Sequence, residues 1–190
     1  GEVLVDGVNV KNYKFDTLYD KLGYVTQKAV LFAGSIRENV FFGESAAPET
    51  DEELKNAIEL SQAEEFVNKL PDGTEHMISQ MGRNVSGGQK QRLSIARALS
   101  RKPEILVFDD SFSALDYKTD AKLREGLNEK LKDTTKIIVA QRISTIRHAD
   151  KIIVLDRGEA VGMGTHEELM KNCDVYKEIA LSQLSAAELA

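Results

Sequence analysis

The sequence has 190 residues, of which 42% are hydrophobic, enough apolar material for one domain of ordinary size. Its formal net charge of −6 argues against a large basic face for nucleic acid, so no nucleic-acid partner is expected. The single cysteine, Cys173, excludes an intrachain disulfide and is typical of a reducing compartment. No apolar run approaches the roughly 20 residues that span a bilayer, so any membrane link must come from other residues or from a partner.

The N-terminal stretch predicts a hairpin, a helix and a strand. Apolar residues alternate along positions 3–10 on either side of Asp6-Gly7, a dipeptide typical of tight hairpin turns. Residues 15–22 then fit a short helix, and Tyr24–Thr26 fits a strand.

Residues 31–101 follow a mostly helical pattern. Asp51 is expected to cap one helix, whose apolar positions are 54, 57, 58 and 60. Another helix is expected to begin at Ser86 and to run to about Ser100. We therefore interpret this segment as a helical insertion.

Three uninterrupted apolar runs follow, at residues 105–108, 137–140 and 152–155. A helical stretch at about 117–131 separates the first two, and residues 165–185 add one or two amphipathic helices. Continuous β-branched runs that alternate with helices indicate a parallel sheet covered on both faces. The expected fold class is α/β, with residues 1–30 and 102–190 in one lobe and residues 31–101 in a helical subdomain.

The segment Val85-Ser86-Gly87-Gly88-Gln89 opens the second of these helices. Ser86 and Gln89 have the spacing of a capping box, which is sufficient to explain where the helix starts. It does not explain two adjacent glycines, which are poor helix formers but let a ligand approach the backbone closely. A helix N-terminus with bare amides also suits a phosphate.

Asp109 ends the first apolar run. A carboxylate at the C-terminal tip of a buried parallel strand lies where α/β folds bind their ligands, and in nucleotide hydrolases such an aspartate holds Mg²⁺. Many strands end in aspartate, so this feature alone is weak. Here the strand comes soon after the helix that begins with Ser-Gly-Gly-Gln, and the combination is much more specific.

These motifs together resemble the ABC ATPase family over essentially the whole chain. Gln27 resembles the Q-loop glutamine, residues 85–89 the signature motif with Val for the usual Leu, residues 105–109 the Walker B strand, and residues 113–116 the D-loop. Residues 34–40, Gly-Ser-Ile-Arg-Glu-Asn-Val, resemble the sequence that follows the Q-loop in multidrug and peptide exporters.

The resemblance implies a RecA-like P-loop NTPase lobe with a mostly parallel sheet, here incomplete, and an α-helical signature subdomain. It implies the cofactors ATP and Mg²⁺ and a head-to-tail pair with a second nucleotide-binding domain. In that pair, Ser86, Gly87, Gly88 and Gln89 would contact the ATP of the partner and Asp116 would cross the interface. Asp109 and Gln27 would bind the Mg²⁺ and the γ-phosphate of the chain's own site. The resemblance also implies a location at the cytoplasmic face of the membrane, through a transmembrane domain outside this sequence.

The sequence departs from the family pattern in the phosphate-binding loop. No Gly-x-x-x-x-Gly-Lys-[Ser/Thr] occurs, and there is no Gly-Lys pair at all. That loop supplies the amide cradle and the lysine for the phosphates. We expect that the sequence begins inside the domain and that these 190 residues alone are inactive.

Two further departures fall on catalytic positions of the chain's own site. Asp110 stands where the family usually has the glutamate that orients the attacking water, and it is shorter by one methylene. Gln141 replaces the switch histidine and cannot carry a proton near neutral pH. A small backbone shift that lets Asp110 work, or a harmless polar residue at 141, is the alternative. The pair favours the degenerate half of a heterodimeric exporter whose signature serves the partner site.

Two other functions of the same superfamily remain open. An importer ATPase is one, although residues 35–39 have the exporter form. A soluble ABC-class ATPase acting on nucleic acid or ribosomes is the other, although it would usually carry coiled-coil insertions or tandem domains.

The histidines and the basic residues that follow the signature segment are interpreted as structural or surface residues. The three histidines lack the spacing of a metal site and are expected at the surface or in loops. The basic face of Lys90, Arg92, Arg97 and Arg101 is interpreted as a solvated face or a domain contact rather than a nucleic-acid site.

Overall fold

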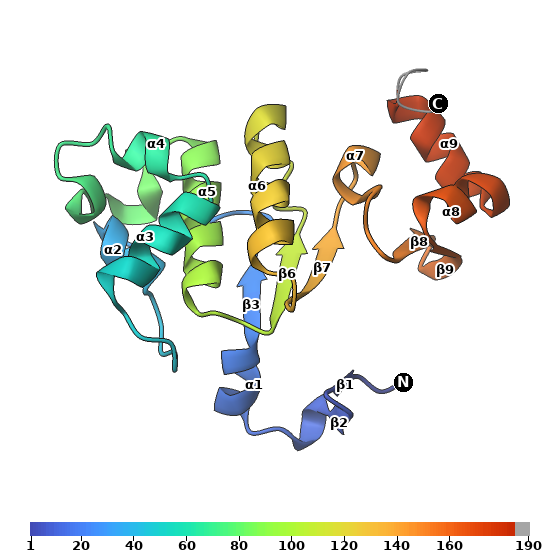
Figure 1. The fold of residues 1–190 in the computed structure, drawn as a ribbon, viewed down its shortest axis with the longest axis horizontal. Coiled ribbons are helices and arrows are strands. Elements are labelled where there is room, and N and C mark those ends of the chain that lie inside the picture. Colours follow the sequence, from blue (N-terminus) through green and yellow to red (C-terminus); the bar gives the residue numbers. More distant parts are fainter. Residues whose placement is uncertain (185–190) are drawn as a thin grey trace. The chain divides into compact units, whose positions relative to one another are not determined.

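The structure is a computed structural model that describes residues 1–184 (Figure 1). The chain forms two compact units, residues 1–139 and a second unit that begins at Ala140. The proposed site residues other than Gln141 lie in the first unit.

A three-stranded parallel sheet forms the centre of the first unit. Its strands are β3 (Leu22–Val25), β6 (Ile105–Asp109) and β7 (Thr135–Val139), in the order β3-β6-β7. Val25, Phe108 and Ile138 are in register across it. The predicted parallel sheet is thus confirmed for the first two apolar runs, and β6 is its central strand.

The third apolar run does not join this sheet. It forms β8 (Ile152–Asp156), which pairs antiparallel with β9 (Glu159–Gly164) in the second unit. The chain reverses between them at Arg157-Gly158, where both residues have positive φ, 49° and 86°. Such a turn joins two antiparallel strands directly, so the prediction of a third parallel strand is wrong.

Only one face of the parallel sheet is buried in the described residues. Val25, Leu106 and Phe108 point into the core, whereas Tyr24, Ile137 and Val139 on the other face are each more than half exposed. The expectation that both faces are covered is therefore wrong for residues 1–184.

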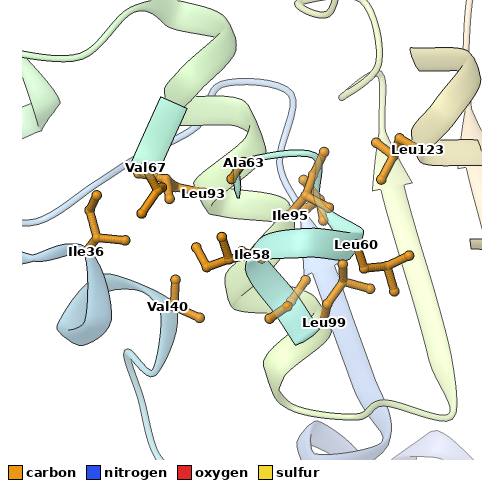
Figure 2. Packing of buried hydrophobic residues seen from close by; sticks show 14 of the residues in the cluster. Ile36, Val40, Ile58, Leu60, Ala63, Val67, Leu93, Ile95, Leu99 and Leu123 are labelled. Carbon is orange, nitrogen blue, oxygen red and sulfur yellow. The ribbon is translucent and has the colours of Figure 1, made fainter. Parts of the chain in front are cut away.

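The buried face packs against two long helices, α5 (Gly87–Ser100) and α6 (Tyr117–Lys130). Leu93 and Ile95 of α5 and Leu123 of α6 are completely buried in the same core as the sheet residues (Figure 2). Both helices agree with the sequence prediction within one or two residues.

The predicted helical segment contains α2 (Ile36–Val40), α3 (Asp51–Leu60) and α4 (Glu64–Val67). Thr50, rather than Asp51, caps α3, because its hydroxyl accepts a hydrogen bond from the Glu53 amide at 3.2 Å. Asp51 is the first helical residue, where its charge is favourable to the helix dipole. The apolar residues predicted for α3 are all buried.

The remaining elements of the first unit are short. The predicted hairpin is present as β1 (Leu4–Val5) and β2 (Val8–Asn9), followed by α1 (Phe15–Lys21). Within the mostly helical segment, β4 (Gly34–Ser35) pairs with β5 (Met77–Ile78). The 3₁₀ helices are η1 (Val10–Asn12), η2 (Gly73–Glu75) and η3 (Gln80–Gly82).

The second unit packs its hairpin against α8 (His166–Asn172) and α9 (Asp174–Gln183), and α9 also packs against α7 (Ile143–Ile146). Its own core contains Ile152, Val154, Leu169 and Tyr176, together with the free thiol of Cys173. Across residues 1–184, none of the helices has the length and apolar character needed to span a membrane.

Candidate functional site

Two strands of the parallel sheet bring their polar ends together. Gln27 follows β3, Asp109 ends β6 and Asp110 comes directly after it, so the carboxyl ends of neighbouring parallel strands meet at one edge. The side-chain amide Nε2 of Gln27 donates to Oδ2 of Asp110 over 3.1 Å. Three predicted site residues from distant parts of the sequence therefore share one small area.

Tyr24 is a neighbour of this area that the sequence reasoning missed. Its hydroxyl donates to Oδ2 of Asp109 over 2.9 Å. This hydrogen bond to a carboxylate is the main reason that the pKa of Tyr24 is raised above its ordinary value. Tyr24 pairs with Val107 in the register of the sheet, and Asp109 lies two residues further along the same face. The alternation of side chains between the two faces of the strand is the sequence signal that could have placed Tyr24 on the face of Asp109.

The backbone of Asp110 adopts a left-handed conformation, with φ at 45°. Aspartate is among the few non-glycine residues that tolerate this region. The Asp110 amide donates to the Val139 carbonyl at 2.9 Å, and its own carbonyl accepts from the Ser113 hydroxyl at 2.7 Å. The carboxylate at this position is thus aimed by a main chain that is held on both sides.

The predicted capping box at the start of α5 is confirmed. The Ser86 hydroxyl accepts from the Gln89 amide at 3.3 Å, and Oε1 of Gln89 accepts from the Ser86 amide at 2.8 Å. Ser86 and Gly87 are exposed. The helix N-terminus is therefore both fixed in shape and open to solvent.

The packing of the first unit does not require glycine at positions 87 and 88. A Cβ at Gly87 would meet no heavy atom within 4 Å, and one at Gly88 would make only an ordinary contact with the Ala114 carbonyl at 3.5 Å. At Gly23, by contrast, a Cβ would lie 2.7 Å from Leu106 Cδ2 and 2.8 Å from Pro103 Cγ. Glycines without an internal reason leave room for something else to approach the backbone.

Asp116 directly precedes α6 as its N-cap residue, two positions after Ala114. Its carboxylate caps the helix, accepting from the Thr119 amide at 3.0 Å and from the Thr119 hydroxyl at 2.7 Å. These bonds hold the pKa of Asp116 below its ordinary value. Asp116 is exposed, so a capping role and a contact outside the chain are compatible.

Gln141 lies at the start of the second unit and is exposed. Its backbone carbonyl accepts a hydrogen bond from Nε2 of Gln183 at 2.9 Å, and Oε1 of Gln183 accepts from the Ile143 amide at 2.9 Å. The end of α9 therefore fixes the main chain next to Gln141.

Two arginines of the predicted basic face are half-buried against neighbouring segments. The guanidinium of Arg97 donates to the Asn39 carbonyl at 2.7 Å and to the Val30 carbonyl at 2.9 Å, and burial lowers its pKa. Arg92 donates to the Gln62 carbonyl at 2.8 Å and lies over the Phe66 ring. Both guanidinium groups therefore bind main-chain carbonyls of the same unit, and the interpretation as a purely solvated face is wrong for these two residues.

The side-chain oxygen atoms of Asp109 and Gln27 are of the type that binds Mg²⁺. Carboxylate oxygens of Asp109 and the amide oxygen of Gln27 are hard donors, and Mg²⁺ is commonly held by one or two carboxylates together with substrate phosphates. No group of three or more His, Cys, Asp and Glu that could hold a metal occurs in the described range 1–184. A site here would therefore depend on phosphate oxygens to complete the coordination.

A comparison with known protein families identifies the family of the chain. The family model described as ABC transporter matches residues 1–113. The chain belongs to the ABC transporter family. Its mixed α/β structure, with a parallel sheet and a helical part, has the P-loop NTPase fold of an ABC ATPase domain.

Individual ABC proteins are similar to nearly all of the chain. A putative ABC transporter ATP-binding protein of Mycoplasma genitalium is 44% identical over 96% of the chain and 31% of its own length. A putative multidrug export ATP-binding/permease protein of Staphylococcus aureus is 41% identical over 94% of the chain and 31% of its own length.

A solved structure gives the same result. The structure of a bacterial Atm1-family ABC exporter with ATP bound matches with a TM-score of 0.89 and 34% identity, over 96% of this chain and 32% of that one. The chain thus spans about a third of the length of the proteins it matches.

Proposed function

We propose that this ABC-family chain is the nucleotide-binding part of an exporter and couples the binding and hydrolysis of ATP to efflux. The support is the similarity to a multidrug export protein and to an Atm1-family exporter with ATP bound. In this proposal a transmembrane domain outside these 190 residues holds the chain at the cytoplasmic face of the membrane. Residues 31–101 act as the subdomain that presents the signature motif, and residues 1–30 and 102–190 form the catalytic lobe.

The chain would contribute to two composite sites. At its own site, Asp109 and Gln27 would hold Mg²⁺ and face the γ-phosphate, and Asp110 and Gln141 would occupy the positions that orient the attacking water. Bound Mg²⁺ would neutralise phosphate charge during phosphoryl transfer. The hydrogen bond between Gln27 and Asp110, at 3.1 Å, supports the grouping of these two residues.

At the second site, Ser86 to Gln89 would contact ATP held by another nucleotide-binding domain, with Asp116 at the interface. The observation that carries this proposal is the open space at Gly87 on an exposed, capped helix N-terminus. Amides at a helix N-terminus attract phosphate, and a glycine lets it come close.

The chain's own site is proposed to hydrolyse ATP poorly. An aspartate at position 110 is shorter than glutamate by one C–C bond, about 1.5 Å, and a misplacement of that size can cost on the order of 100-fold in rate. Gln141 can donate a hydrogen bond to a phosphate but does not become charged. The partner would then be a second, different ABC domain, and the pair would be a heterodimer.

The 190 residues by themselves are proposed to bind ATP weakly. No Gly-Lys pair occurs in this sequence, and the phosphate cradle of this fold depends on one. Calorimetric titration of the chain with ATP and Mg²⁺ should give no micromolar affinity. A dissociation constant in that range would contradict the proposal.

The shared second site is tested by Ser86→Arg in the complete transporter. A bulky cation at the exposed N-terminus of α5 should block the approach of the nucleotide and reduce hydrolysis at the partner's site at least tenfold. Thr165→Arg is the matched control, because Thr165 forms an exposed capping box of the same kind at α8. Normal hydrolysis in Ser86→Arg would rule out the proposed geometry.

A further inference from the structure

Gln91 is a buried polar side chain on the helix that carries the signature motif. It is 1% exposed, and its amide Nε2 donates to the Thr26 carbonyl over 3.2 Å. Thr26 is the residue directly before Gln27, and its hydroxyl donates to the Lys28 carbonyl at 2.8 Å. The main chain that carries Gln27 is therefore held from α5 at the point where it leaves β3.

A second residue of α5 holds the same stretch further along. Arg97, six residues and about 9 Å along the helix axis from Gln91, donates to the Val30 carbonyl at 2.9 Å. Residues 26–30 are thus attached at both ends to one rigid helix. Between these attachments the exposed side chain of Gln27 reaches across to Asp110.

We propose that Gln91 is a positioning residue that sets the place of Gln27 relative to Asp110 by holding the Thr26 carbonyl. Because α5 begins at Gly87, the same hydrogen bond links the signature half-site to the chain's own half-site. A displacement of the α5 N-terminus is transmitted to Gln27 through a connection of five residues of helix and one hydrogen bond. The role of Gln27 itself rests on the proposed function.

The first test measures the attachment directly. Gln91→Met keeps the length and approximate volume of the side chain but removes the donor. Amide hydrogen exchange of the peptide that covers residues 26–30 should become about tenfold faster in Gln91→Met, because the stretch loses one of its two attachments. Ser94→Ala is the matched control, a buried polar residue one turn further along α5, and should leave the exchange of this peptide unchanged. Unchanged exchange in Gln91→Met overturns the proposal.

The second test asks whether Gln91 acts through Gln27. In the complete transporter, Gln91→Met should lower the kcat for ATP at least threefold and change KM less than twofold, since binding groups are left in place. In a Gln27→Ala background the same substitution should have no further effect. An equal loss in both backgrounds means that Gln91 has only a structural role, and it overturns the proposal.

The outcomes separate this inference from the proposed function. If Gln27→Ala alone leaves ATP turnover unchanged, the assignment of Gln27 to the nucleotide site fails, and so does the positioning role of Gln91. If exchange becomes faster in Gln91→Met but Gln27→Ala does not change ATP turnover, the hydrogen bond of Gln91 has a structural role only, and the positioning role is overturned. If Gln91→Met does not fold, Gln91→Leu serves the same two measurements, because it is apolar, shorter and also lacks the amide donor.

Discussion

The side-chain amide of Gln27 lies 3.1 Å from the carboxylate of Asp110, although the two residues follow different strands of the sheet. In the proposed function, Asp110 stands at the position that orients the attacking water. The Asp110 carboxylate extends less far from the backbone than a glutamate carboxylate would, by the length of one methylene. The length of this side chain is therefore the first property to change.

Asp110→Glu combined with Gln141→His should raise ATP turnover at the chain's own site about tenfold or more, because the longer carboxylate and a protonatable ring restore the usual pair. The measurement is single-turnover hydrolysis in the complete transporter with the partner's water-orienting residue removed. Asp110→Asn with Gln141→His is the control, since it keeps the short side chain and should give no increase. Equal rates for the Glu and Asn variants would contradict the degenerate-site proposal.

The same substitution should also affect stability. Position 110 has positive φ, which glutamate tolerates less well than aspartate or asparagine. Asp110→Glu is therefore expected to lower the free energy of unfolding by about 1 kcal/mol. Denaturant unfolding of Asp110→Glu beside Asp110→Asn separates this backbone cost from the gain in rate.

Gly87→Ala separates the needs of the fold from those of a ligand. A Cβ at this position meets nothing within 4 Å, so the free energy of unfolding should stay within about 0.5 kcal/mol of the original value or rise. Hydrolysis at the partner's site should nevertheless fall at least tenfold, because the added methyl lies where the nucleotide approaches. Gly23→Ala is the opposite case, since its Cβ would clash with Leu106 and Pro103 and should cost about 2 kcal/mol or more. Full activity in Gly87→Ala would remove the main support for the shared site.

Tyr24 gives a prediction for pH. Its hydrogen bond to Asp109 raises the pKa of the phenol in the folded state. The resulting stabilisation is fully present below the ordinary tyrosine pKa of about 10 and is lost as the pH rises through the raised value. Titration of ¹³C-labelled tyrosine by NMR should show that Tyr24 ionises at a higher pH in the original protein than in Asp109→Asn, where the charge of the acceptor is absent. Identical titrations in the two proteins would show that the hydrogen bond is absent in solution.

Arg97 is expected to matter for stability rather than for solubility. Arg97→Met should lower the free energy of unfolding by about 2–4 kcal/mol, because the Val30 and Asn39 carbonyls lose their donor and the rings of Phe32 and Phe42 lose the cation above them. Arg83→Met, at an exposed position, is the control and should change it by less than about 0.5 kcal/mol. Equal effects of the two substitutions would mean that the buried contacts of Arg97 contribute nothing net.

The sequence by itself determined the features that depend on neighbours within a few positions. The Asp6-Gly7 hairpin, the capping box of Ser86 and Gln89, and the extents of α5 and α6 all follow from turn residues, caps and the 3.6-residue period. The order of the motifs along the chain also identified the family. These signals are local, so they can be read without knowing which segments meet.

The tertiary structure decided which distant segments pair and which charges are buried. An apolar run such as residues 152–155 has the same pattern in a parallel sheet and in a hairpin, and only its pairing with β9 shows that it forms a hairpin. Arg97 looked like part of a solvated helix face until the carbonyls of Val30 and Asn39 were placed beside it. Strand partners, side-chain burial and the contact between Gln27 and Asp110 depend on residues far apart in sequence, because the free energy of each comes from surfaces that only the folded chain brings together.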